Sequence, residues 1–137
     1  MLAEINYKKV LNMEALSISG TTKTPAVEFD PVQGQFRIIG RSHPENAKIF
    51  YKPIIDWLEE YVKNPGVNTI LNVQLEHFNT SSSKCILDVF KNLESIYKTD
   101  HEVEINWYFE EDDEDILDAG EDYRSFLELP MNLIKIE

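Results

Sequence analysis

Cysteine, basic residues and long apolar runs are scarce in this chain. Cys85 is the single cysteine among 137 residues, which excludes an intrachain disulfide and a zinc site anchored on paired cysteines. No stretch approaches the about 20 apolar residues of a membrane span, and residues 1–9 lack the apolar core of a signal peptide. We therefore expect a protein of the reducing cytoplasm, neither secreted nor inserted in a membrane.

The shortage of basic residues also bears on partners. Thirteen lysines and arginines face 25 acidic residues, so the net charge is −12, which disfavours nucleic acid and anionic membranes as partners. A basic protein surface is a more natural partner. Hydrophobic residues make up 42% of the chain, enough for the core of one domain. We expect a single domain over residues 13–137, preceded by an N-terminal extension over residues 1–12 to which no function is assigned.

The first half of the chain predicts strands and then a helix. Short alternating segments at residues 16–19, 26–30 and 35–39 indicate strands, and the turn sequence at residues 31–34 joins the last two as a hairpin. Ser42 and Glu45 have the spacing of a capping box, so a helix is expected to begin there and to end at residues 64–66. Pro53 predicts a kink or two abutting segments in that helix.

The second half alternates strand and helix. Leu71, Val73 and Leu75 alternate with polar residues, which predicts a strand that ends near Phe78. A stripe with helical spacing follows and predicts a helix, and residues 103–109 predict another strand. Beyond them, Gly120 and Pro130 interrupt the apolar pattern, so the C-terminal part is weakly specified. The order predicts an α/β fold: a mixed β-sheet with an N-terminal antiparallel hairpin, right-handed βαβ crossovers and helices packed on it.

Four consecutive hydroxyl residues, Thr80-Ser81-Ser82-Ser83, stand between the predicted strand and helix. They are expected in the first helical turn, where unpaired N–H groups and the positive end of the helix dipole accept a cap and tolerate a phosphate. Physical reasoning alone does not choose among Thr80, Ser81 and Ser82 as acceptor. The simpler interpretation is a cap with a solvated turn.

Other candidate sites carry less specific patterns. The acidic run at residues 110–115 offers oxygen ligands for Mg²⁺ or Ca²⁺ but lacks the spacing of an EF-hand, so a solvated loop or a docking surface for a basic partner fits it better. His43, His77 and His101 show no paired metal-ligand spacing. His77 should lean toward the buried face, which weakens a Ser-His catalytic pair. Cys85 is expected to be an inert packing residue.

Four separated motifs stand out along the chain. They are Thr24-Pro25-Ala26-Val27-Glu28-Phe29-Asp30, Ser42-His43-Pro44-Glu45-Asn46-Ala47 with Phe50-Tyr51, Phe78-Asn79-Thr80-Ser81-Ser82-Ser83-Lys84, and Asn106-Trp107-Tyr108 before the acidic run. Together, over about residues 16–130, they resemble the SiaC family of bacterial regulatory phosphoproteins.

The resemblance implies a fold similar to the STAS domains of anti-sigma factor antagonists, with Thr80 at the phosphoacceptor position. It also implies three partners: a Ser/Thr protein kinase, a PP2C-like phosphatase, and a diguanylate cyclase that the unmodified protein activates. Asn79, Ser81, Ser82, Ser83 and Lys84 are then the surroundings of the phosphosite and the expected partner contacts.

The leading hypothesis is a non-enzymatic signalling protein controlled by phosphorylation, without cofactor or metal. Two alternatives belong to other classes. One is a metal-dependent hydrolase that uses the acidic run, and the other is a STAS-like module that binds a small ligand in an apolar pocket.

Overall fold

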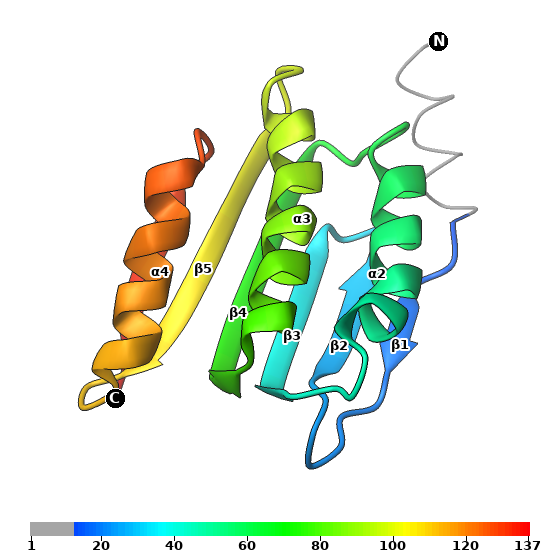
Figure 1. Cartoon of the computed structure of the whole chain (residues 1–137). Coiled ribbons are helices and arrows are strands. Elements are labelled where there is room, and N and C mark those ends of the chain that lie inside the picture. Colours follow the sequence, from blue (N-terminus) through cyan, green and yellow to red (C-terminus); the bar gives the residue numbers. More distant parts are fainter. Residues whose placement is uncertain (1–12) are drawn as a thin grey trace, which may run out of the picture.

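The computed structural model describes residues 13–137, and the N-terminal extension expected over residues 1–12 lies outside the described residues. Within them, one six-stranded sheet carries helices on a single face (Figure 1). The strands are β1 (Leu16–Ile18), β2 (Ala26–Asp30), β3 (Gln35–Ser42), β4 (Asn68–Phe78), β5 (Glu102–Glu110) and β6 (Met131–Ile136). The helices are α2 (Ala47–Tyr61), α3 (Thr80–Tyr97) and α4 (Glu114–Phe126).

The strands lie in the sheet in the order in which they occur in the chain. β1, β2 and β3 pair antiparallel, and β3, β4, β5 and β6 pair parallel. Each of the last three connections passes through one helix, and because right-handed crossovers that advance in one direction put their helices on one side, α2, α3 and α4 share a face (Figure 1). The mixed sheet with its N-terminal hairpin, predicted from the sequence, is confirmed.

The hairpin between β2 and β3 depends on one glycine. Gly34 has φ of 68°, and a Cβ there would lie 2.0 Å from the carbonyl oxygen of Asn68. Only glycine combines the left-handed conformation with this close approach. The turn at residues 31–34 thereby brings β3 beside β4.

The core lies between the sheet and the helices. Alternate strand residues such as Phe36, Leu71 and Trp107 are buried against helix residues such as Ile54 and Phe90. The other face of the sheet is polar at its centre, where Asn72, Asn106 and Asn132 lie side by side on β4, β5 and β6. Their amides hydrogen-bond across the strands at 3.0 and 2.9 Å.

The start of α2 differs from the expectation. Its N-cap is Asn46, whose Oδ1 accepts from the N–H of Ile49 at 3.1 Å, and not Ser42. Instead, β3 continues to Ser42, and the Ser42 side chain lies buried in the core. Pro53 lies inside a single helix and not between two segments. Because Pro53 and Ile49 are both on the exposed side of α2, solvent can bind the carbonyl that a proline leaves unpaired.

The weakly specified C-terminal part forms α4 and then β6. Gly120, expected to interrupt the apolar pattern, lies inside α4 and is buried. A Cβ at this position would lie 2.5 Å from Cδ1 of Trp107, so the glycine lets α4 approach the indole. The Trp107 Nε1–H donates to the carbonyl of Ile116 at 2.8 Å and anchors α4 to the sheet.

Across residues 13–137, no helix is both long and apolar enough to cross a membrane.

Candidate functional site

The hydroxyl run lies where β4 ends and α3 begins, as predicted. The N-cap of α3 is Asn79, whose Oδ1 accepts from the N–H of Ser82 at 2.8 Å. The N–H of Asn79 donates to the carbonyl of Ser42 at 3.0 Å, which fixes this corner to the end of β3. Because Asn79 already caps the helix, the hydroxyls beyond it are not needed as caps.

Exposure divides the four hydroxyl residues into two pairs. Ser82 is fully buried and Ser83 is half-buried, whereas Thr80 and Ser81 are exposed. A kinase must reach the oxygen that it phosphorylates, so the accessible acceptors are Thr80 and Ser81. Ser82 was expected among the partner contacts, but in this fold its side chain does not reach the surface.

The hydroxyl of Ser82 belongs to a buried network that joins three elements. Ser42 Oγ lies 2.7 Å from the Tyr51 hydroxyl and donates to Ser82 Oγ at 2.8 Å. Ser82 Oγ in turn donates to the carbonyl of Ser42 at 3.1 Å. Burial, only partly opposed by the hydrogen bond to Ser42, raises the pKa of Tyr51 to about 12, so the network is uncharged at neutral pH. It holds the first turn of α3 against β3 and α2.

Ser83 is held from the opposite side, by α4. The Tyr123 hydroxyl donates to the carbonyl of Ser83 at 2.8 Å and also lies 3.1 Å from Ser83 Oγ. Burial raises the pKa of Tyr123 to about 12, so it stays a neutral donor. Sequence reasoning missed both tyrosines as site residues. No local spacing indicates the contact of Tyr123 with Ser83, 40 positions away, and Tyr51 meets Ser42, 9 positions away, only because β3 and α2 pack together.

Positive charge is present one turn from Thr80. Lys84 follows Thr80 by four residues, which places the two side chains on the same flank of α3. Lys84 is exposed and forms no ion pair with the residues that the structure describes. Together with the helix N-terminus, it makes the surroundings of Thr80 favourable for an added anion.

The histidines do not form the catalytic pair that was considered. His77 is exposed, and the prediction that it leans toward the buried face is wrong. A register shift between Gly40 and Arg41 pairs His77 with Arg41, and its ring stacks on that of His43 with the centroids 4.5 Å apart. In the described part of the chain, no hydroxyl of the run is hydrogen-bonded to His77.

The acidic run covers the end of β5, a short turn at residues 111–113 and the start of α4, and the solvated loop that was expected is confined to that turn. Glu110 ends β5, and Asp113 is the N-cap of α4, with Oδ1 3.1 Å from the N–H of Ile116. Glu114 and Asp115 lie in the first turn, where the helix dipole favours negative charge. Across residues 13–137, no three metal-ligating side chains are grouped to hold an ion.

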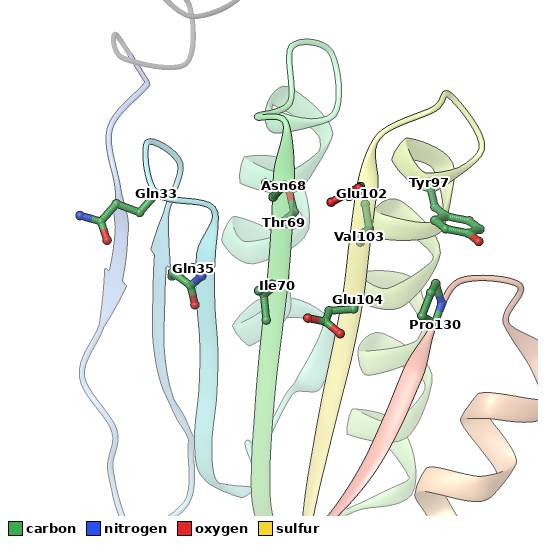
Figure 2. Close-up of a pocket in the computed structure, with 10 residues that line it drawn as sticks. All are labelled: Gln33, Gln35, Asn68, Thr69, Ile70, Tyr97, Glu102, Val103, Glu104 and Pro130. Carbon is green, nitrogen blue, oxygen red and sulfur yellow. The ribbon is translucent and has the colours of Figure 1, made fainter.

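A large hollow lies at the opposite end of the sheet from Thr80, and Figure 2 shows its lining. It has a volume of about 570 Å³. Polar side chains share its lining with Ile70, Val103 and Pro130, so the hollow is mixed in character. The lining residues are Gln33, Gln35, Asn68, Thr69, Ile70, Tyr97, Glu102, Val103, Glu104 and Pro130.

Known proteins match this arrangement over nearly the whole chain. The model of a family described as SiaC family regulatory phosphoprotein matches residues 18–136. An uncharacterized protein of Pseudomonas aeruginosa strain UCBPP-PA14 is 30% identical over 118 residues, which span 86% of this chain and 94% of that relative.

Solved structures agree with the sequence matches. The crystal structure of apo-SiaC from Pseudomonas aeruginosa superposes with a TM-score of 0.82 at 29% identity, covering 89% of this chain and 99% of that one. A chain in the crystal structure of diguanylate cyclase SiaD in complex with its activator SiaC, from the same organism, gives 0.83 at 28% identity, covering 88% and 99%. The chain therefore belongs to the SiaC family of regulatory phosphoproteins.

Proposed function

We propose that this chain is a non-enzymatic bacterial signalling protein whose partner binding is controlled by reversible phosphorylation of Thr80. In the unmodified state it binds and regulates a diguanylate cyclase, and thereby cyclic di-GMP synthesis. A Ser/Thr kinase adds the phosphate and a PP2C-like phosphatase removes it. Family membership supports this proposal, as does the complex of Pseudomonas aeruginosa SiaC with the cyclase SiaD that it activates.

The observation that carries the proposal is the exposure of Thr80 beside two serines that are engaged elsewhere. Ser82 and Ser83 are bonded to Ser42 and Tyr123, while Thr80 lies exposed in the first turn of α3. A phosphate on Thr80 therefore displaces no internal hydrogen bond of the described residues.

The added charge would be tolerated by the free protein. Phosphorylation brings a charge of about −1.5 to −2 and three acceptor oxygens. The helix N-terminus favours such a charge by about 0.3 to 1 kcal/mol, and Lys84 lies on the same flank. We therefore expect the domain to keep its fold when it is modified.

A bound partner would not tolerate the same charge. An interface packed on neutral Thr80 would have to desolvate a phosphate whose charge the single ammonium of Lys84 does not fully neutralise, which costs about 3 to 5 kcal/mol. Since each 1.4 kcal/mol is tenfold in affinity, the loss amounts to a factor of about 100 or more. Phosphorylation would act by blocking association and not by refolding.

Thr80 and Ser81 are both exposed, and the choice of Thr80 is supported by the family resemblance and by the neighbours of each residue along the helix. Positions four and seven residues ahead lie on the same flank. For Thr80 these are Lys84 and Leu87, whereas for Ser81 they are Cys85 and Asp88. A phosphate on Thr80 would lie next to Lys84, whereas a phosphate on Ser81 would lie on the same flank as Asp88, so the charge is better placed on Thr80.

Three variants test the proposal against the diguanylate cyclases of the native host, expressed singly and assayed for cyclic di-GMP synthesis. Wild type and Thr80→Ala should activate one of them, and Thr80→Asp should not. Ser81→Asp is the matched control, because it puts the same charge on the neighbouring exposed residue, and it should retain most of the activation. Far-ultraviolet circular dichroism should be unchanged in all of them.

Phosphate mapping provides an independent check. Peptide mass spectrometry across residues 76–84 of the protein from its native host should find phosphate on Thr80, and none in a Thr80→Ala strain. Full activation by Thr80→Asp, or phosphate on Ser81 alone, would contradict the assignment.

A further inference from the structure

A groove between α3 and α4 begins one turn beyond Thr80. Its volume is about 210 Å³, and its lining includes Lys84 and Leu87 from α3, and Ala119, Asp122, Tyr123 and Phe126 from α4. We refer to these six residues as the α3–α4 groove. Figure 1 shows α4 beside α3 on the same face of the sheet. The groove lies between these two neighbouring helices.

Two polar contacts brace the groove, one toward each end. Near the start of α3, the Tyr123 hydroxyl contacts Ser83, and near the end of α4 the Lys91 Nζ donates to the carbonyl of Phe126 at 3.3 Å. One turn before Tyr123 on α4, Ala119 lines the groove with only a methyl group. The small side chain and the fixed helix spacing keep the groove open without a partner.

The walls of the groove are apolar and partly uncovered. Leu87 and Ala119 are half-buried, and Phe126 is 63% exposed. A large aromatic side chain that remains exposed beside a hollow marks an apolar surface whose burial by a partner is favourable. Two helices that flank such a hollow form the receptor of helix-in-groove recognition.

The rims carry opposite charges. Lys84 borders the groove on α3, and Asp122 borders it on α4, with Asp115 two turns earlier on the same side. Lys84 has no acidic partner among the described residues, although the chain carries 25 acidic residues. An acidic group from outside is therefore the natural partner of Lys84.

We propose that the α3–α4 groove is where the partner protein docks, through an amphipathic helix that seats apolar side chains between Leu87 and Phe126 and places an acidic residue over Lys84. This proposal rests on the proposed function.

A docking site in the groove would also account for phosphorylation of Thr80 and not of Ser81. A phosphate on Thr80 lies on the flank of Lys84, neutralises that lysine and repels the acidic residue of the incoming helix. The same phosphate on Ser81 would lie on the flank that faces away from the groove.

Two variants of the full-length protein test the groove with the cyclase that the wild type activates. Ala119→Phe fills the groove, and Phe126→Ala removes an exposed wall with little risk to folding. Each should weaken binding about tenfold or more in calorimetry, because both change the centre of the contact. Ser125→Phe adds the same aromatic group on the outer side of α4 and should bind like the wild type.

The proposed ion pair of Lys84 is tested separately. Lys84→Gln should weaken binding and reduce its dependence on salt concentration, since one ion pair is lost. Normal binding by both Ala119→Phe and Phe126→Ala, with wild-type binding intact, would overturn the docking site and leave the proposed function standing. Failure of the wild type to bind any cyclase would overturn both. Self-association of the wild type that Phe126→Ala abolishes would assign the groove to a second copy of this chain and also overturn the proposal.

Discussion

The division of the hydroxyl run into structural and accessible members predicts a large difference between two similar substitutions. Ser82→Ala removes an oxygen that accepts from Ser42 Oγ at 2.8 Å and donates to the Ser42 carbonyl at 3.1 Å, at a fully buried position. Thr80→Ala removes an exposed hydroxyl two residues earlier in the same helical turn. The first should destabilise the protein and the second should not.

The size of the difference depends on the contacts that remain after each change. In Ser82→Ala, the Ser42 carbonyl still accepts from the Asn79 N–H at 3.0 Å, and Ser42 Oγ still lies 2.7 Å from the Tyr51 hydroxyl. No group is left wholly unpaired, so two buried hydrogen bonds amount to a loss of about 1–2 kcal/mol. An exposed change such as Thr80→Ala typically stays within about 0.5 kcal/mol.

Thermal and urea unfolding, followed by circular dichroism, measure both variants. An unfolding entropy of about 2.1 cal/mol/K per residue gives about 0.29 kcal/mol/K for the whole chain, so Ser82→Ala should lower Tm by about 3–7 °C. Thr80→Ala should shift Tm by less than about 2 °C. Equal losses in the two variants, or no loss in Ser82→Ala, would refute the argument that burial separates these hydroxyls.

Three further predictions concern the surrounding fold. Gly120→Ala usually stabilises a helix, but here its Cβ would lie 2.5 Å from Trp107, so unfolding experiments should show a loss of about 1–3 kcal/mol. Burial raises the pKa of Glu94, but the N–H of Glu128 and the Lys91 ammonium outweigh burial and hold that pKa below its usual range. Because the charged carboxylate is favoured in the folded state, the advantage of wild type over Glu94→Gln in unfolding free energy should be full at neutral pH and shrink as the pH falls below about 4.3. Burial also raises the pKa of the Cys85 thiol, so iodoacetamide at pH 7.5 should alkylate Cys85 slowly in the folded protein and rapidly in urea.

Much of the fold was predictable because neighbouring residues determine it. Leu71, Val73 and Leu75 alternate with polar residues and are buried as the period of two requires. The turn at residues 31–34 carries the glycine that its left-handed conformation needs. Such signals act over a few residues, and distant parts of the chain do not override them.

The errors occur where distant contacts decide the outcome. Ser42 has the spacing of a helix cap, yet the buried hydroxyl of Ser82, 40 residues away, engages it in the core. Gly120 resembles a break, yet the indole of Trp107 requires the absence of a side chain there. Local propensity cannot report either contact, because both depend on the assembled sheet. The position of the hydroxyl run was predictable, but the separation of Thr80 from Ser82 was not.

The buried hydroxyls also determine where a phosphate on Thr80 would exert its effect. Ser82 ties the first turn of α3 to β3 and α2, and Ser83 ties it to α4. A helix start that is held from both sides cannot relax by moving away from a new charge. The free energy of the modification must therefore appear at the surface, at Lys84 and at whatever covers the α3–α4 groove. Weakening the contact of Ser82 with Ser42 or that of Ser83 with Tyr123 should therefore make the switch less effective, although Thr80 is unchanged. We expect Tyr123→Phe to reduce the effect of Thr80→Asp on partner affinity, that is, the difference between Tyr123→Phe alone and Tyr123→Phe combined with Thr80→Asp. A difference as large as in the parent protein, measured by calorimetry, would show that the rigidity of this turn has no part in the switch.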